Sequence, residues 1–181
     1  MAGSILSIIK KRRSTRHFIQ KEVDDSILLE LVEAAIWAPT GGNIQMWYFV
    51  IVKEKGVLER VKAFSPGLLG DPSCLVVVCS DRKKAFERAG KLGRDESCVM
   101  DTSMAAQNLM LMAAEKGLGT CPIGSFNKKA VGKILELPGY ISPDLIISIG
   151  YPAKDVKPPK RKGVEEVTFI NKWGVGINGQ E

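Results

Sequence analysis

The stretch formed by residues 97–116 constrains the fold most, because the helix that it predicts is apolar on nearly every face. Leucine, valine and four methionines share it with alanines, and Gly117 follows, a residue that suits a left-handed helix cap. A continuous helix of this length spans roughly 30 Å. A helix that is apolar nearly all round is buried in a core or in a subunit interface. We expect both roles, and therefore a homodimer.

Short apolar runs predict the sheet that this helix covers. Residues 48–52, 75–79 and 145–151 are typical of buried strands, and residues 166–170 predict a last strand. Amphipathic segments between them predict further helices, one beginning at Asp24 and ending at Ala38 before Pro39. Because helices and strands alternate without regular βαβ spacing, we expect an α+β sandwich with helices on both faces of a small sheet. The 181 residues, 45% of them apolar, fit a single domain.

Composition bounds the classes of partner and site. A net charge of +6 allows an anionic ligand, nucleic acid or an acidic surface without choosing among them. His17 is the only histidine and no CxxC pair occurs, so we expect no metal site. Four widely spaced cysteines indicate reduced, buried thiols. Since no signal peptide or run of membrane-spanning length is evident, we expect a cytoplasmic protein with no membrane partner.

Two short segments are candidate ligand sites. Residues 10–16, Lys-Lys-Arg-Arg-Ser-Thr-Arg, place five cations within seven positions. They form either a solvated basic face or a set of arginine forks for a terminal phosphate. Residues 40–43, Thr-Gly-Gly-Asn, form a turn between a buried helix and a buried strand, which is either a ligand floor or an ordinary connection. We expect a second glycine-containing loop at residues 119–126.

Taken together, these stretches resemble the FMN-dependent nitroreductase family, from Ile8 to Trp173. The motifs that carry the resemblance are RRSTRHF at 12–18, AAIWAPTGGNIQ at 34–45 with WYFV at 47–50, AAQNL at 105–109, GLGTCPIG at 117–124, GYP at 150–152 and KRKGVEEV at 160–167. Each motif alone is weak, and their order and spacing make the set specific. Thr40 stands where the family usually has serine, and Met46 stands where it usually has proline.

The resemblance implies an FMN site shared by two chains. Its phosphate and ribityl chain would be held near the N-terminus, its ring would be lined by the glycine turn, and its N5 edge would face the loop after the long helix. Late basic residues would return to the phosphate. The residues concerned are Arg12, Arg13, Ser14 and Arg16, then Pro39, Thr40, Gly41, Asn43 and Gln45, then Pro122, Ile123 and Gly124, and finally Lys160 and Arg161.

The same resemblance implies a three-layer sandwich with a small mixed or antiparallel central sheet, in an intertwined homodimer. Residues 1–181 would form one FMN-binding domain, with about 168–181 as an extension that reaches the partner subunit. NADH or NADPH would give hydride to FMN N5, and a nitroaromatic, quinone or flavin acceptor would then take it in a ping-pong cycle. No catalytic side chain is implied.

Two alternatives stay open at this point. The first is a flavin enzyme of the same fold with other chemistry, such as dehalogenation or flavin destruction. The second is a non-enzymatic protein that binds nucleic acid through its basic segments. We expect no nucleic-acid partner, because those segments adjoin apolar runs and aromatic residues make up only 7% of the chain.

Overall fold

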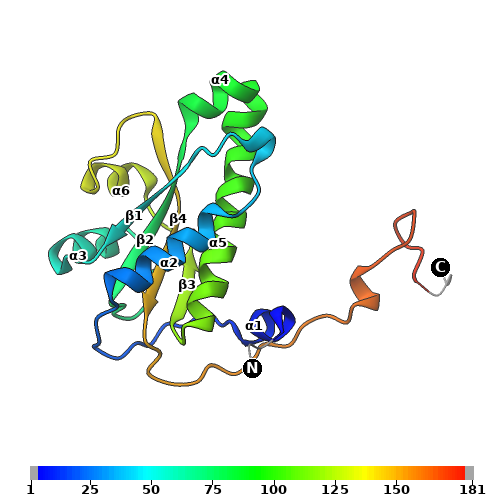
Figure 1. Ribbon diagram of the computed structural model, residues 1–181, viewed down its shortest axis with the longest axis horizontal. Helices are drawn as coiled ribbons and strands as arrows, with labels where there is room; N and C mark the ends of the chain where they lie inside the picture. The colour runs from blue at the N-terminus through cyan, green and yellow to red at the C-terminus, as the bar shows by residue number, and fades with distance from the viewer. Residues whose placement is uncertain (1–3, 178–181) are drawn as a thin grey trace.

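A four-stranded antiparallel sheet forms the centre of the computed structural model, which describes residues 4–177 (Figure 1). The strands lie in the order β1-β2-β4-β3. Their bounds are β1 (Trp47–Val52), β2 (Cys74–Asp81), β3 (Gly119–Ile123) and β4 (Ile141–Gly150). β2 and β4 are the two inner strands, which explains why both read as continuous apolar runs.

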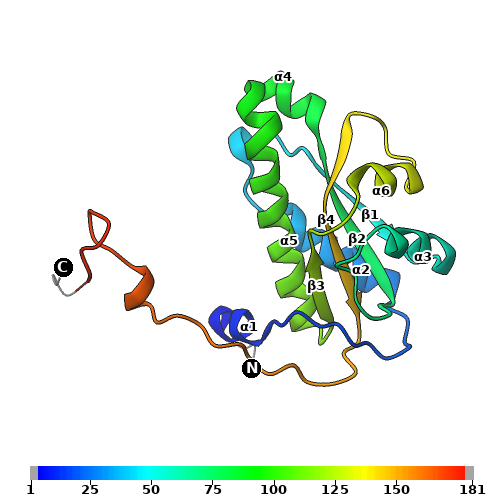
Figure 2. The ribbon, with the colours of Figure 1, turned by 180° about the vertical axis from the view of Figure 1, so that it is seen from behind.

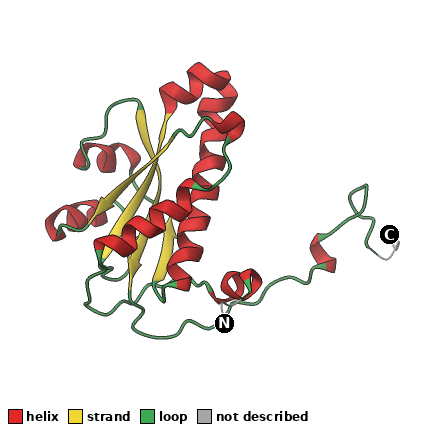
Figure 3. Cartoon of the chain, in the orientation of Figure 1, coloured by secondary structure: helices red, strands yellow, loops and turns green. Residues whose placement is uncertain are grey.

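Helices cover both faces of this sheet and give the expected three layers (Figure 3). One face carries α2 (Asp25–Ile36) and α5 (Cys98–Glu115), and the other carries α3 (Lys55–Ala63) and α6 (Lys128–Ile134). α1 (Ile5–Lys11) lies beside α5, and α4 (Arg82–Leu92) leads into α5 through a π-helical turn at Gly93–Ser97. The predicted α+β sandwich is confirmed.

Strand β2 explains why the sheet needs both helical layers. Val76 and Val78 point into the cluster formed with α2 and α5, whereas Leu75 and Val77 point into the cluster formed with α3 and α6. All four side chains are fully buried. Full burial of such a side chain is worth about 1.5–3 kcal/mol, so neither face of β2 tolerates exposure to water.

Local sequence signals set most of the helix ends. The Asn127 side chain accepts a hydrogen bond from the Ala130 amide at 3.0 Å and caps α6. Gly117 has a φ of 75° directly after α5, as expected for a left-handed cap. α2 begins after Asp24 and ends at Ile36, two residues earlier than predicted. Among residues 4–177, no helix is long and apolar enough to span a lipid bilayer.

Two predicted elements are wrong. The first part of the expected loop at 119–126 is strand β3, which pairs with β4 at the edge of the sheet. Pro122 is tolerated there because the N-terminal segment pairs with the outer side of β3 at Thr120 and not at Pro122. The expected strand at 166–170 is a 3₁₀ turn at Glu165–Val167 followed by an isolated bridge between Phe169 and Gly176. This part of the chain runs away from the sheet (Figure 2), and no strand within residues 4–177 pairs with it.

The four cysteine side chains are all buried and none forms a disulfide. Burial raises the pKa of the Cys74 thiol and of the Cys79 thiol to about 12.

We therefore expect the folded protein to react slowly with the thiol reagent DTNB at mildly alkaline pH, because the reactive thiolate is scarce and shielded. Denaturant should expose all four thiols at once. Rapid stoichiometric labelling of the folded chain would contradict this burial.

Candidate functional site

The basic N-terminal segment lies against the edge strand β3 and is not a free solvated face. The Thr15 amide donates a hydrogen bond to the Thr120 carbonyl oxygen at 2.8 Å, and Ser14 forms a parallel bridge with Thr120. Thr15 is 4% exposed. A Cβ at Gly119 would lie 2.6 Å from the Thr15 side chain, so the close approach of the two segments depends on glycine.

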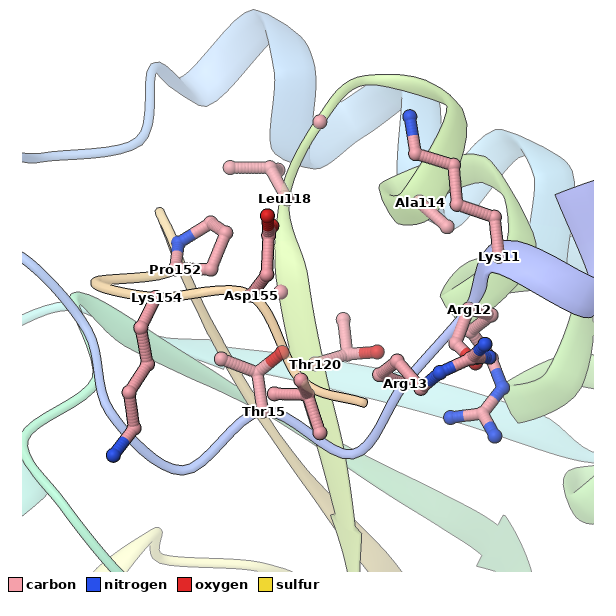
Figure 4. Close-up of a pocket in the computed structure, with 13 residues that line it drawn as sticks. Lys11, Arg12, Arg13, Thr15, Ala114, Leu118, Thr120, Pro152, Lys154 and Asp155 are labelled. Carbon is pink, nitrogen blue, oxygen red and sulfur yellow. The ribbon is translucent and has the colours of Figure 1, made fainter. Parts of the chain in front are cut away.

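A cavity of about 380 Å³ opens between this segment, the end of α5 and the chain after β4 (Figure 4). Figure 4 shows the Arg12 and Arg13 side chains gathered at one side of it. Cationic side chains outnumber the one carboxylate in its lining. The lining residues are Lys11, Arg12, Arg13, Thr15, Ala114, Gly117, Leu118, Gly119, Thr120, Pro152, Lys154, Asp155 and Val156.

Two arginine nitrogens beside this cavity are buried without a hydrogen-bond partner among the described residues. They are Nη1 of Arg12 and Nε of Arg13. Burial lowers the pKa of Arg12, and the neighbouring cations Arg13 and Arg161 lower it further. Both side chains are half-buried, and Arg13 Nη1 already donates to the carbonyl oxygens of Lys10 and Arg12. A buried nitrogen without an acceptor still costs free energy. The arrangement is therefore suited to an anion with several acceptor oxygens, such as a phosphate.

The structure brings only part of the predicted phosphate set together. Arg12 and Arg13 line the cavity, and Arg161, almost 150 residues later, lies close enough to lower the Arg12 pKa. Arg161, Arg16 and Lys160 are all exposed, and none of them lines the cavity. The backbone of Ser14 pairs with Thr120 and helps to hold the basic segment against β3. The sequence did not point to Thr120 or Lys154, because neither belongs to a charged run.

The glycine turn forms a second cluster, with a strained backbone. Gly42, Asn43 and Gln45 have φ values of 57°, 54° and 51°, in the left-handed region that disfavours side chains. The Gln45 amide donates to Thr40 Oγ1 at 3.2 Å, and Gln45 Nε2 donates to Asn43 Oδ1 at 3.0 Å. Pro39, Gly41, Asn43 and Gln45 are exposed, so the turn presents its surface outward.

Sequence reasoning missed the residue that anchors this turn. The Gly41 amide donates to the Asp101 carboxylate at 3.2 and 3.3 Å. Asp101 lies in the first turn of α5 and is 3% exposed. A carboxylate near the start of a largely apolar helix was the available signal, because a buried acid needs a partner.

The third predicted group lies at the far end of β3. Ile123 is buried in the core against α3 and α6, whereas Pro122 and Gly124 are exposed. A Cβ on Gly124 would meet nothing within 4 Å, so its backbone is open to close approach. A ligand can therefore reach Pro122 and the backbone at Gly124, but not the buried Ile123 side chain.

In one chain, the glycine turn and the arginine cavity lie at opposite ends of α5 (Figure 1). Asp101 holds the turn, and Ala114, thirteen positions later on the helix, lines the cavity. At 1.5 Å per residue, the two positions are separated by roughly 20 Å. The glycine turn and the arginine cavity are thus distant from each other within a single chain.

Comparison with known proteins gives consistent matches across this chain. Residues 9–65 and 57–151 match the Nitroreductase family. A protein of Archaeoglobus fulgidus, described as a candidate NADH dehydrogenase/NAD(P)H nitroreductase, is 33% identical over 158 residues, covering 84% of this chain and 87% of the other. An NADH dehydrogenase of Thermus thermophilus is 26% identical over 188 residues, covering 88% and 92%. The crystal structure of a nitroreductase family protein from Streptococcus pneumoniae superposes with a TM-score of 0.83 at 25% identity, covering 91% and 98%.

Glycine substitutions test how the basic segment is held. Gly119→Ala should lower the free energy of unfolding by about 1–3 kcal/mol, because the new methyl group must displace Thr15. Gly132→Ala in α6 is the matched control, since its Cβ meets nothing within 4 Å and alanine favours the helix by up to about 1 kcal/mol. Urea denaturation measures both. Equal stability of the two variants would show that Gly119 does not set this contact.

Proposed function

Because the chain belongs to the nitroreductase family, we propose that it is an FMN-dependent enzyme that transfers hydride from NADH or NADPH to a small organic acceptor. The comparisons show that the chain is an NAD(P)H-dependent oxidoreductase. FMN as the cofactor, a ping-pong cycle, and a nitroaromatic, quinone or flavin acceptor are the parts that we propose. The proposal rests on the family, on the arginine cavity and on the division of the site into two groups.

The buried, unpartnered arginine nitrogens are the observation that supports FMN most directly. Arg12 Nη1 and Arg13 Nε lack acceptors among residues 4–177, and Arg161 lies near them. A terminal phosphate offers several acceptor oxygens and about two negative charges, which would offset the repulsion among these cations. The residues present therefore fit a phosphate-bearing flavin. Arg12 and Arg13 would hold the phosphate, with Arg161 approaching them. Ser14, Arg16 and Lys160 remain in the proposed set, although they do not line the cavity in one chain.

When bound, FMN supplies the redox chemistry, taking up hydride at N5 from the nicotinamide and delivering it to the acceptor. The chain supplies position and charge. The glycine turn, with Pro39, Thr40, Gly41, Asn43 and Gln45, would line the ring with its exposed surface. Pro122, Ile123 and Gly124 would offer backbone at the edge of β3. No side chain in either group is placed to serve as a general acid or base, and we assign none.

The separation of the two groups supports a homodimer with a shared site. A flavin cannot reach both ends of α5 in one chain, so the glycine turn would come from a second copy. Apolar side chains exposed near α5 support the same assembly: Ile5 is 76% exposed, Trp37 is 80% exposed and Met100 is 59% exposed. Ile5 and Trp37 border an apolar groove of about 400 Å³ between α1, α2 and α5.

The C-terminal segment supports a dimer in which each chain extends an arm onto its partner. Beyond residue 155 the chain leaves the sheet as an arm (Figure 2). Trp173 is 89% exposed and Val164 is 72% exposed, although the Trp173 ring contacts Phe169 with centroids 4.6 Å apart. An arm that carries apolar side chains into solvent is suited to packing on a partner. In our proposal residues 1–181 form one domain, and residues 168–181, of which 178–181 lie outside the described part, reach the second subunit.

Absorbance spectroscopy tests the proposed cofactor and donor. The purified protein should be yellow, or become so after incubation with FMN, and anaerobic NADH or NADPH should bleach the flavin band. The bleached protein should recover its colour with a quinone or a nitroaromatic compound. A colourless protein that takes up no FMN would refute the proposal.

Arg12→Ala should weaken FMN binding by about 10- to 100-fold, because the phosphate loses a charge-assisted hydrogen-bond donor. Fluorescence titration of the flavin-free protein measures this change. Arg60→Ala removes an exposed arginine from α3 and is the matched control, with no expected effect. Light scattering checks that both variants keep the assembly of the wild type. Unchanged FMN affinity in Arg12→Ala would remove Arg12 from the site.

Deletion of residues 168–181 should weaken the dimer, because it removes Trp173 and Phe169 from the proposed contact. We expect the dissociation constant of the dimer to rise at least about tenfold, as is usual when buried aromatic anchors are lost. Analytical ultracentrifugation over a dilution series measures it. A truncated protein that dimerises as tightly as the wild type would show that the arm does not contribute to the interface.

A further inference from the structure

We propose that Asp101 is a positioning residue that holds the glycine turn, residues 40–45, in the conformation that receives the flavin. This inference rests on the proposed function, since the role of the turn in cofactor binding is itself part of that proposal. The observation behind it is the contact between the Asp101 carboxylate and the Gly41 amide, which joins two residues sixty positions apart.

The position of Asp101 calls for a reason beyond packing. Its side chain is 3% exposed in a helix whose other buried residues are nearly all apolar. The Gly41 amide is the sole hydrogen-bond donor to this carboxylate within residues 4–177, and no cation there pairs with it. Burial raises the pKa of Asp101, and the bond from Gly41 opposes that rise. Burying an acid that has a single backbone hydrogen-bond partner costs free energy. We therefore expect Asp101 to act on that partner, the Gly41 amide.

The turn itself needs external support. Three of its residues, Gly42, Asn43 and Gln45, occupy the left-handed region, and two of them carry side chains that disfavour it. Such a backbone persists only where its surroundings hold it. Pro39, Gly41, Asn43 and Gln45 are exposed, and only Ile44 packs against the core, beside Met46, so most of the turn depends on hydrogen bonds for its support.

Hydrogen bonds from other elements hold both ends of the turn. At its start, Asp101 on α5 accepts from the Gly41 amide. At its end, Lys84 Nζ on α4 donates to the Gln45 carbonyl oxygen at 3.1 Å, and the Asp81 amide donates to the Met46 carbonyl oxygen at 2.7 Å. The contacts at Asp101 and Lys84 are both charge-assisted, and of their two charged groups only the Asp101 carboxylate is fully buried, which makes it a candidate for setting the shape of the turn.

Helix propensity separates this role from a purely structural one. Alanine is a better helix former than aspartate, but a carboxylate in the first turn of α5 also interacts favourably with the helix dipole, so Asp101→Ala removes the acceptor with little net effect on the helix itself. A positioning role predicts that the variant keeps its resistance to urea but releases the turn. Asp101→Asn keeps one acceptor oxygen without the charge and should restore part of the hold on Gly41.

The experiment compares the wild type, Asp101→Ala and Asp101→Asn, with Asp95→Asn as the control for the same chemical change at an exposed carboxylate paired with Arg94. FMN titration of flavin-free protein should show binding weakened about tenfold or more in Asp101→Ala, an intermediate loss in Asp101→Asn and none in Asp95→Asn. Hydrogen exchange of the flavin-free proteins should be faster over residues 40–45 in Asp101→Ala, with the rest of the chain unchanged.

The outcomes distinguish this inference from the function on which it rests. A wild type that takes up no FMN would overturn the proposed function, and the role of Asp101 with it. A wild type that binds FMN, together with an Asp101→Ala variant of equal affinity and equal exchange at the turn, would overturn the role of Asp101 alone. A loss of urea resistance matching the loss of affinity, with no rescue by asparagine, would also overturn it, because Asp101 would then be part of the core.

Discussion

The packing of α5 against the sheet is the interaction on which the rest of the structure depends. Its buried side joins α2 and strands β2 and β4 in one core. Its first turn holds the glycine turn through Asp101, and its last turn borders the arginine cavity through Ala114. Exposed Met100 and Met104 leave part of its surface for a partner. One helix therefore sets the core, the spacing of the two halves of the site and the face available for assembly.

Repulsion between positively charged side chains is the second constraint on the structure. Folding places Arg12 and Arg13 side by side, with two of their nitrogens buried and unpartnered among the described residues, and brings Arg161 near them. Backbone pairing with β3 and the absence of a Cβ at Gly119 position the segment in spite of this repulsion. Free energy gained from packing thus maintains a cation cluster that an anion would stabilise.

Local patterns predicted the elements that bury their own side chains. The run in β2 was recognised as an inner strand because both of its faces are apolar, and α5 because its apolar residues cover almost the whole helix. Strand β3 was mistaken for a loop because glycine and proline are typical of turns, and only pairing with β4 makes it a strand. Residues 166–170 have a strand-like composition, yet none of the strands in the described part of the chain lies beside them.

By itself, the sequence determined the α+β class, the layered core and the residue types of the candidate site, since these follow from periodicity, composition and the order of short motifs. Tertiary structure alone decided that Arg161 approaches Arg12, that Gly41 meets Asp101, and that the two halves of the site lie at opposite ends of α5. The physical reason is that hydrogen bonds and charge interactions act through space. Residues sixty or more positions apart leave no periodic trace of their contact in the chain.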